Sequence, residues 1–142
     1  MDAFMREAIT QARTGLSEGG IPIGSVLVRS GIIIGRGRNR RVQEQNPMKH
    51  AEIDCLINAG RVAYRDTVLY STLMPCYLCA GAVVQFAIPK VIVGESRTFG
   101  GAEAFLREHG VEVINLDLEE CIDLMRSFIR AQPALWNEDI GV

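Results

Sequence analysis

The amino-acid sequence predicts an α/β fold: a three-layer α/β/α sandwich around a central mixed five-stranded sheet. Helical and strand patterns alternate along the second half of the chain, as in parallel sheets whose strands are joined by crossover helices. Two apolar runs near the N-terminus, separated by a short turn, add an antiparallel hairpin. At 142 residues the chain has room for one hydrophobic core, so we expect residues 1–142 to form a single domain.

The first half of the chain predicts a helix, the hairpin and the start of a second helix. Apolar residues recur at helical spacing until Gly19 and Gly20 interrupt the pattern, and the two apolar runs flank residues 29–31. A polar stretch follows and ends where helical spacing resumes. The expected elements are a helix over residues 2–17, strands over 21–28 and 32–37, a loop over 38–49 and a helix beginning at 51.

The second half predicts three more strands and three more helices. Each short run rich in β-branched residues is followed by a segment with helical spacing. Crossovers between parallel strands are right-handed, and we expect the same here. The expected elements are strands over residues 67–73, 90–95 and 111–117 and helices over 77–87, 102–110 and 118–132.

Composition and charge narrow the classes of function. Hydrophobic residues make up 48% of the chain and charged residues 23%, as in globular proteins and unlike disordered ones. Fifteen basic and seventeen acidic residues give a net charge of -2, and like charges form no long run. Nucleic acid is therefore not an expected partner, because a phosphate backbone is bound by concentrated positive charge.

The sequence also predicts a cytoplasmic protein without a membrane contact. It contains no run of ~18 apolar residues, the length that a membrane-spanning helix needs, and the N-terminal MDAFMREAIT lacks the pattern of a signal peptide. The four cysteines do not have the dense spacing of a secreted disulfide scaffold. In a reducing compartment, a Cys-x-x-Cys pair indicates metal or redox chemistry.

Two short motifs carry side chains that bind metals. HAE at residues 50–52 opens one expected helix, and PCYLC at residues 75–79 opens the next, directly after a strand. We therefore expect His50, Cys76 and Cys79 to converge at one end of the sheet, where the helix N-terminus favours thiolates. One imidazole and two thiolates suit Zn²⁺ better than ions that prefer oxygen.

Three protein ligands leave the fourth tetrahedral position of zinc open, as in catalytic rather than structural sites. His109, Cys55 and Cys121 are the other candidate donors, but none has motif spacing to the first three. Water in the open position would have its pKa lowered from ~15.7 to about 7. Glu52, two residues after the metal-binding histidine, is expected to carry protons to and from that water without binding the metal.

A redox pair and a structural zinc site are the alternatives for the two motif cysteines. A histidine and a glutamate at His-x-Glu spacing, with a proline before the first cysteine, favour the catalytic zinc site. For Glu52, the structural alternative is a first-turn carboxylate that stabilises the helix dipole. Cys55 and Cys121 are expected to be small core residues, and His109 a surface residue near a helix end.

From these motifs outward, the chain resembles the zinc-dependent nucleobase deaminases of the cytidine deaminase-like superfamily. HAE followed by PCxxC is shared across that superfamily, and other segments make the chain similar to the fungal type of cytosine deaminase. These segments are SEGGIP (17–22), GRGRNRR (35–41), TLMPCYLCAGA (72–82), VIVGESRTF (91–99) and WNEDIGV (136–142). The resemblance implies the cytidine deaminase-like fold and hydrolysis of cytosine to uracil with release of ammonia.

The resemblance also implies the roles of individual residues. His50, Cys76 and Cys79 would bind one zinc ion per chain, and Glu52 would move protons from water to the ring nitrogen and the departing amine. The family is typically a homodimer with a flexible C-terminal gate.

For the substrate, the resemblance implies contacts from three parts of the chain. Asn39 would hydrogen-bond the carbonyl edge of the base, and Ala51 would offer its backbone N–H. Phe99 and Trp136 would cover the ring faces. Asp139 would accept a hydrogen bond from the exocyclic amine.

The chain departs from the fungal pattern at three positions. Ala51 stands where the fungal enzyme has glycine, Met74 replaces a serine, and Asn137 replaces an aromatic residue. A buried site discriminates between ligands through the hydrogen bonds that it satisfies, so the last two changes bear on which ring fits.

Four residues of the expected substrate site also have a structural alternative. Asn39 is typical of a turn after a strand, and Phe99 of a loop aromatic packed on the core. Trp136 and Asp139 could belong to a frayed terminus. A tryptophan and an isoleucine so near the chain end favour a tail that docks on the protein.

Other functions stay open beside cytosine deamination. The alternative substrates are guanine, a pterin, a creatinine-like ring or the adenosine of a tRNA. For tRNA, residues 38–41 (RNRR) would supply a small basic patch. A closed C-terminal tail would leave no room for the sugar of a nucleoside. A zinc-stabilised binding module without turnover is the alternative from another class, and Glu52 favours an enzyme because such a module needs no general base.

Overall fold

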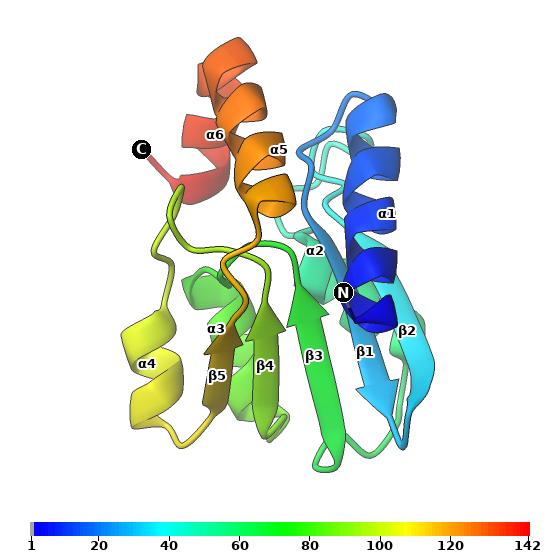
Figure 1. Cartoon of the computed structure of the whole chain (residues 1–142). Coiled ribbons are helices and arrows are strands. Elements are labelled where there is room, and N and C mark those ends of the chain that lie inside the picture. The colour runs from blue at the N-terminus through cyan, green and yellow to red at the C-terminus, as the bar shows by residue number, and fades with distance from the viewer. Residues whose placement is uncertain (1) are drawn as a thin grey trace.

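The computed structural model describes residues 2–142 and places five strands in one sheet, in the order β2-β1-β3-β4-β5 (Figure 1). The strands are β1 (Gly24–Arg29), β2 (Ile32–Arg38), β3 (Thr67–Ser71), β4 (Lys90–Val93) and β5 (Glu112–Asn115). β1 is antiparallel to both β2 and β3, whereas β3, β4 and β5 are parallel to one another. The mixed five-stranded sheet confirms the prediction.

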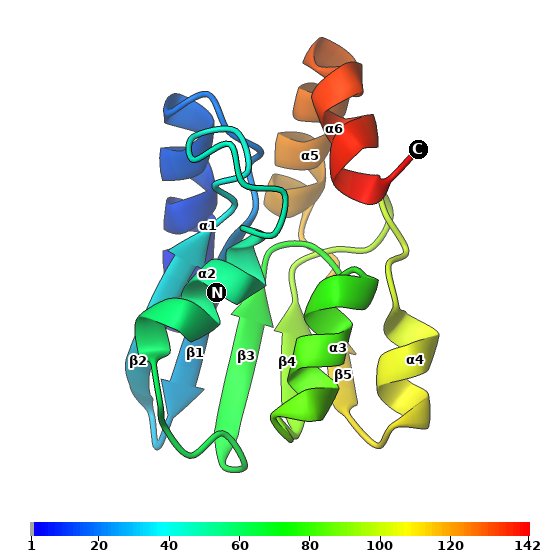
Figure 2. The same ribbon diagram turned by 180° about the vertical axis from the view of Figure 1, so that it is seen from behind.

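Helices cover both faces of this sheet, which confirms the three-layer architecture. The helices are α1 (Ala3–Ser17), α2 (Ala51–Ala59), α3 (Tyr77–Gln85), α4 (Glu103–Glu108), α5 (Glu119–Ala131) and α6 (Pro133–Ile140). α1 and α5 lie on one face, and the view from behind shows α2, α3 and α4 on the other (Figure 2). No helix within residues 2–142 has both the length and the apolar character needed to cross a membrane.

The alternation of side chains along β1 explains how the sheet separates two apolar clusters. Val26 and Val28 join Met5 and Ile9 in the cluster beneath α1. Leu27 points to the opposite face and belongs to the cluster that includes residues of α2 and α3. Both faces of the central strands are therefore buried, as the apolar runs in the sequence predicted.

Close approach between β2 and α2 fixes where the second helix begins. A Cβ atom at Gly37 would lie 2.2 Å from the backbone nitrogen of Cys55 and 2.6 Å from the carbonyl oxygen of Ala51. Because no side chain fits this space, glycine allows the first turn of α2 to rest on the hairpin. His50 is thereby placed at the end of the sheet.

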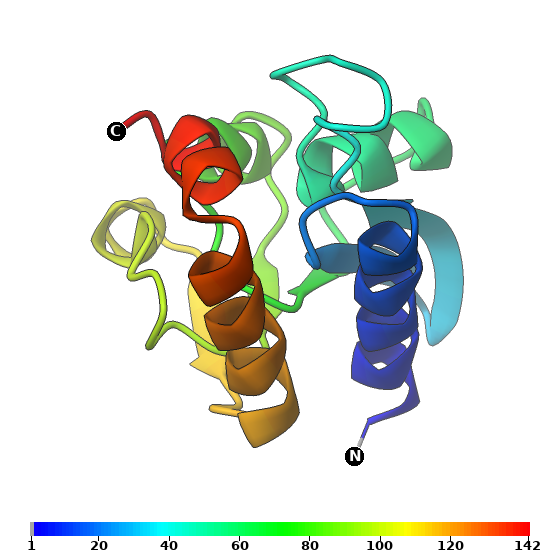
Figure 3. The ribbon, with the colours of Figure 1, turned by 90° about the horizontal axis from the view of Figure 1, so that it is seen from above.

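The C-terminal region differs from the prediction. The expected helix over residues 118–132 corresponds to α5, but a further helix, α6, follows at once and includes the tail that carries Trp136 and Asp139. Pro133 lies at the start of α6, where its missing N–H costs nothing, and Gly141 ends the helix in the left-handed conformation. α6 turns back beside α5 above the ends of the strands (Figure 1), and in the view from above it lies over α3 (Figure 3).

A third apolar cluster seals this end of the sheet. Trp136 of α6 and Phe128 of α5 are buried against residues that flank the strands and α2. The cluster consists of Ile21, Ile23, Ala51, Leu73, Met125, Phe128 and Trp136. The tail is docked on the protein, so the frayed-terminus alternative is wrong for Trp136.

Candidate metal centre and substrate pocket

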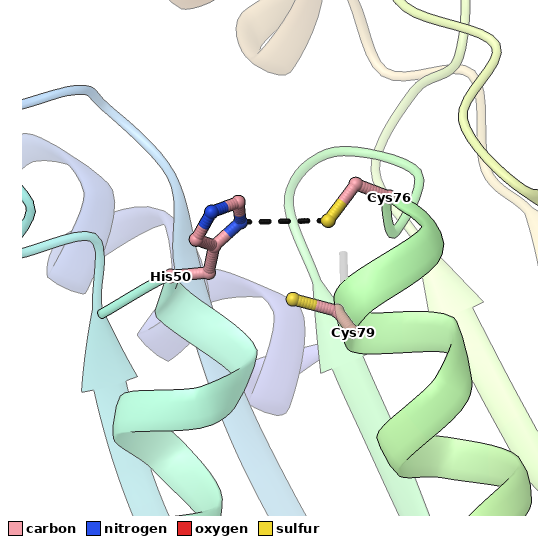
Figure 4. Close-up of side chains that lie close together, drawn as sticks. All are labelled: His50, Cys76 and Cys79. Carbon is pink, nitrogen blue, oxygen red and sulfur yellow. Dashed lines mark hydrogen bonds between the residues drawn. The ribbon is translucent and has the colours of Figure 1, made fainter. Parts of the chain in front are cut away.

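The two sequence motifs bring three metal-binding side chains together at the ends of two helices. His50 is the N-cap residue of α2, Cys76 is the N-cap residue of α3, and Cys79 lies in the first turn of α3. One donor atom from each residue lies within 4.8 Å of the other two. The side chains face one another across the gap between the helices (Figure 4).

The spacing of these donors fits a zinc ion. Cys76 Sγ lies 3.5 Å from His50 Nδ1. Zinc bonds of about 2.3 Å to sulfur and about 2.0–2.1 Å to nitrogen, at a tetrahedral angle, separate two such donors by about 3.6 Å. The residues present therefore match the chemistry and the size of zinc.

No fourth histidine, cysteine, aspartate or glutamate in residues 2–142 joins this group of donors. Cys55 and Cys121 are buried in the apolar clusters on opposite faces of the sheet. His109 is exposed at the end of α4, with its Nδ1 atom 2.9 Å from the carbonyl oxygen of Phe105. A three-donor site is the arrangement that catalytic zinc uses, because it keeps one position for water or substrate.

The two cysteines differ in their affinity for a proton. A hydrogen bond with Cys79 lowers the pKa of the Cys76 thiol to about 4 against the effect of burial, and His50 acts in the same direction. The pKa of Cys79 is raised well above its ordinary value, because the hydrogen bond to Cys76 and burial both favour the thiol. The expectation of two predisposed thiolates therefore holds for Cys76 alone, and metal binding would have to release the Cys79 proton.

Glu52 lies beside the metal donors in the first turn of α2 and is almost fully buried. Burial raises its pKa to about 7, and the negative charge of Cys76 adds to the shift, whereas His50 opposes it. A carboxyl group whose pKa is near neutral can both accept and donate a proton under cellular conditions. Glu52 therefore has the position and the acidity of a proton carrier.

A small buried pocket lies next to these residues and contains most of the expected substrate contacts. Its lining residues are Ile23, Asn39, His50, Glu52, Leu73, Met74, Cys76, Phe99, Trp136 and Asp139. Ala51 does not line it; its side chain is fully buried in the third apolar cluster. The sequence did not indicate Ile23 and Leu73. Both residues lie next to strand ends, Ile23 just before β1 and Leu73 two residues after β3, at the end of the sheet that carries the motifs. This position could have indicated that they line the site.

The polar wall of the pocket is formed by Asn39 and Asp139, which are 100 positions apart in the sequence. Asn39 Nδ2 donates a hydrogen bond of 3.1 Å to Asp139 Oδ1, and Asn39 Oδ1 accepts one of 3.1 Å from the backbone N–H of Arg41. The oxygen of the Asn39 amide is therefore occupied outside the pocket, and its NH₂ group faces Asp139. The wall presents one donor and one acceptor.

The aromatic wall depends on a buried carboxylate that the sequence did not indicate. Phe99 and Trp136 meet edge to face, with ring centroids 5.5 Å apart. Glu95 is fully buried and accepts hydrogen bonds of 2.9 and 3.0 Å from the backbone N–H groups of Arg97 and Thr98. These bonds fix the turn after β4 and so place Phe99 against α6.

The match to a protein family decides the class of this chain. The cytidine and deoxycytidylate deaminase zinc-binding region matches residues 1–95, which include both motifs. The chain belongs to this family. It is a zinc-dependent deaminase, a hydrolase that acts on a C–N bond.

Individual relatives of this deaminase cover nearly the whole chain. A cytosine deaminase of Candida albicans is 45% identical over 141 residues, covering 96% of this chain and 94% of the relative. A tRNA-specific adenosine deaminase of Bacillus subtilis is 37% identical over 142 residues, covering 91% and 88%. The resemblance to nucleobase deaminases is confirmed, and family membership favours an enzyme over a zinc-stabilised binding module.

Solved structures of deaminases share the fold. A structure from studies of A-to-I editing by tRNA:A34 deaminases aligns with a TM-score of 0.78 at 30% identity, over 86% of this chain and 98% of that one. A guanine deaminase from Bacillus subtilis aligns with a TM-score of 0.65 at 26% identity, over 92% and 95%.

In this deaminase, one buried aspartate ties the loop before the metal site to α2. Asp54 accepts hydrogen bonds of 3.0 Å from the backbone N–H of Arg38, 3.0 Å from Arg40 Nε and 3.1 Å from Lys49 Nζ. Both ends of the segment from Asn39 to Lys49 are thereby held. Since His50 follows Lys49, these contacts also restrict the position of the metal donor.

Replacing this aspartate should loosen the segment. We expect Asp54→Ala to lower the free energy of unfolding by about 1–3 kcal/mol, less than for a fully buried ion pair because both cationic partners are partly exposed. Zinc affinity should fall as well, because His50 is less restrained. Urea unfolding and competition with a chelating dye measure the two effects.

Glu44→Ala is the matched control for Asp54→Ala. Glu44 is exposed and lies 3.8 Å from Arg40 Nε and from Lys49 Nζ, so its loss should cost less than about 0.5 kcal/mol. Equal effects of the two substitutions on stability and zinc affinity would contradict the anchoring role of Asp54.

Proposed function

We propose that this deaminase hydrolyses a free nucleobase and that its substrate is cytosine, which it converts to uracil and ammonia. The observation that carries the proposal is the similarity to the Candida cytosine deaminase, which is 45% identical along 96% of the chain. The pocket supports it, because it combines a proton carrier, one polar wall and one aromatic wall within reach of the metal donors.

The proposed metal ligands are His50, Cys76 and Cys79, and the proposed proton carrier is Glu52. When bound, zinc supplies Lewis acidity that makes water available as a nucleophile near neutral pH. Glu52 would accept a proton from the attacking water and deliver protons to the ring nitrogen and then to the departing amine. Its buried position keeps the proton within the pocket between these steps.

The polar wall supports recognition of a ring that has a carbonyl and an amine. Asn39 would donate from Nδ2 to the carbonyl oxygen, and the Asp139 carboxylate would accept from the exocyclic amine. Phe99 and Trp136 would cover the ring. In the closed structure Asn39 and Asp139 satisfy each other, so a substrate must replace their hydrogen bond with one contact to each, which selects against rings that lack either group.

The basic segment before the metal site supports a free base over a tRNA substrate. Arg36 pairs with Glu7, Arg38 with Glu18 and Arg40 with Asp54. Positive charge that is neutralised within the protein contributes little to binding a phosphate backbone. The burial of Trp136 over the pocket also leaves no opening for an attached sugar in the closed structure.

Ammonia release from a panel of amino-heterocycles tests the proposal. We expect zinc-loaded protein to act on cytosine and 5-substituted cytosines in preference to isocytosine, cytidine, guanine, pterins, creatinine and an adenosine-containing anticodon stem-loop. Glu52→Gln should lower the rate on cytosine by a factor of about 10²–10⁴, because the amide cannot carry the proton, while leaving the zinc content unchanged. Glu44→Gln, at an exposed glutamate, is the control and should match the parent.

Two results would contradict this assignment. A preference for cytidine, guanine or the anticodon stem-loop would refute cytosine as the substrate. Parental activity in Glu52→Gln would refute the proton-carrier role, whichever substrate proves to be the best.

We also propose that two copies of the chain associate through an apolar face formed by α2 and α3. Ile57 is 57% exposed and Phe86 49%, and both border a hollow of about 540 Å³ between the two helices. Tyr77 and Leu78 are exposed at the other end of α3. A contiguous apolar patch of this kind marks an interface more often than a solvated surface.

Sedimentation of single-residue variants tests this association. We expect the parent to have twice the chain mass of 15.6 kDa and Ile57→Lys to have the mass of one chain, because a buried lysine at the interface would be desolvated without a partner. Ile32→Lys, at an isoleucine of β2 that is 64% exposed, should leave the parental mass unchanged. A monomeric parent at micromolar concentration would refute the association.

The cytoplasm stays the proposed location of the protein. Cys55, Cys76, Cys79 and Cys121 are free thiols in the structure. A site that depends on two thiolates is best preserved in a reducing compartment.

A further inference from the structure

The substrate pocket is closed, so some part of its wall must move before a base can bind. Its free volume is about 10 Å³, which holds about one water molecule, whereas ligand pockets are typically about 300–1,000 Å³. Two of its walls come from α6, through Trp136 and Asp139. α6 is an eight-residue helix at the end of the chain, joined to the rest only through α5.

Arg41 belongs to the loop of residues 39–49, and its side chain reaches between this loop and α6. Its guanidinium donates a hydrogen bond within the loop. Its side chain is only 7% exposed. Nε donates a hydrogen bond of 3.1 Å to the carbonyl oxygen of Pro47. The backbone N–H of Arg41 binds Asn39 Oδ1, so the same residue orients the base-binding amide. The side chain therefore has a fixed place in the loop even without α6.

The contacts of Arg41 with α6 are longer, and two of the three are ionic. Its Nε lies 3.5 Å from Asp139 Oδ1, and a terminal nitrogen lies 3.5 Å from the carbonyl oxygen of Glu138 and 3.7 Å from its carboxylate. A hollow of about 380 Å³ adjoins these contacts, with Pro47 on the loop side and Leu135 on the α6 side. Apolar packing between loop and helix is thus incomplete here, and charge attraction crosses the gap.

We propose that Arg41 is a positioning residue that latches α6 over the substrate pocket. Its positive charge holds Glu138 and Asp139 against the loop, which keeps Trp136 buried and Asp139 beside Asn39. Its role in substrate binding rests on the proposed function, whereas its control over the position of α6 does not.

Release of α6 would open one end of the protein without unfolding the rest. The two larger apolar clusters, which hold the sheet and its other helices together, contain no buried residue of α6. Release of α6 would expose Trp136 and part of the third cluster, and the sheet would stay packed. Local opening of a terminal element without global unfolding is the expected result.

Trp136 is the sole tryptophan of the chain, so its fluorescence reports the position of α6 directly. We expect Arg41→Gln to increase the acrylamide quenching of Trp136 by at least about twofold, which corresponds to the loss of a modest ion-pair contribution. Arg41→Lys keeps the positive charge, but a single ammonium group cannot contact both Pro47 in the loop and the carboxylates of α6. Its quenching should therefore lie between that of the parent and that of Arg41→Gln. Far-ultraviolet circular dichroism and the melting temperature should change little.

A second variant leaves the loop intact and reverses the charge on the other side. Glu138 has a side chain that is 67% exposed, so Glu138→Lys is tolerated by the fold but repels Arg41. It should increase quenching as Arg41→Gln does. Arg36→Gln, which removes a surface pair with Glu7, is the control and should leave quenching at the parental value.

Enzyme kinetics then separate the latch from the chemistry. We expect Arg41→Gln to raise KM for cytosine several-fold while kcat stays within about threefold of the parent, since Glu52 and the metal donors are untouched. Unchanged quenching in both Arg41→Gln and Glu138→Lys would overturn the latch. An enzyme that prefers another substrate, with increased quenching in both variants, would refute the proposed substrate and keep the latch.

Discussion

The convergence of two helix N-termini on one point is the constraint on which the rest of the structure depends. α2 and α3 begin on either side of the end of β3, and they bring His50 within 3.5 Å of Cys76 although twenty-six residues separate them in the sequence. This meeting requires that α2 rest closely on the hairpin, which Gly37 permits, and that only a short loop separate β3 from α3. The positive ends of both helix dipoles then face the same small volume, where they stabilise negative donors.

A second layer of buried polar contacts brings distant segments to that point. Asp54 anchors the loop that leads to His50, Glu95 shapes the turn that leads to Phe99, and Asn39 binds Asp139 at the opposite end of the chain. The carboxylates of Asp54 and Glu95 each accept hydrogen bonds from several donors, which is the condition under which their desolvation is tolerated. Their combined effect is a pocket whose walls come from four separate loops, the start of α2 and the terminal helix α6.

Local patterns predicted the parts of the protein in which spacing along the chain decides the structure. The alternation of strands and helices, and the hairpin around residues 29–31, predicted the sheet and its layers. The His-x-Glu and Cys-x-x-Cys spacings predicted that His50, Glu52, Cys76 and Cys79 meet, because each pair shares one helical turn. The predicted strands were too long by about two residues at several ends, and some of the residues beyond the strand ends form the site loops.

Contacts between distant segments were beyond the reach of these patterns. Nothing in the sequence around Glu95 shows that its carboxylate is buried beneath the turn before Phe99, and nothing around Arg41 shows that it faces Glu138. α6 is an intermediate case. Pro133 and Gly141 mark the start and the end of a helix, but the resemblance implies the identities of the tail residues and not their helical form.

We propose that one imidazole and two thiolates hold a single zinc ion and leave one position for a non-protein ligand. X-ray absorption at the zinc edge of purified protein measures the donors directly. We expect one zinc per chain with two sulfur donors at about 2.3 Å and two nitrogen or oxygen donors at about 2.0–2.1 Å, and the loss of one nitrogen donor in His50→Ala. A third sulfur donor, or protein that folds and turns over substrate without zinc, would contradict it.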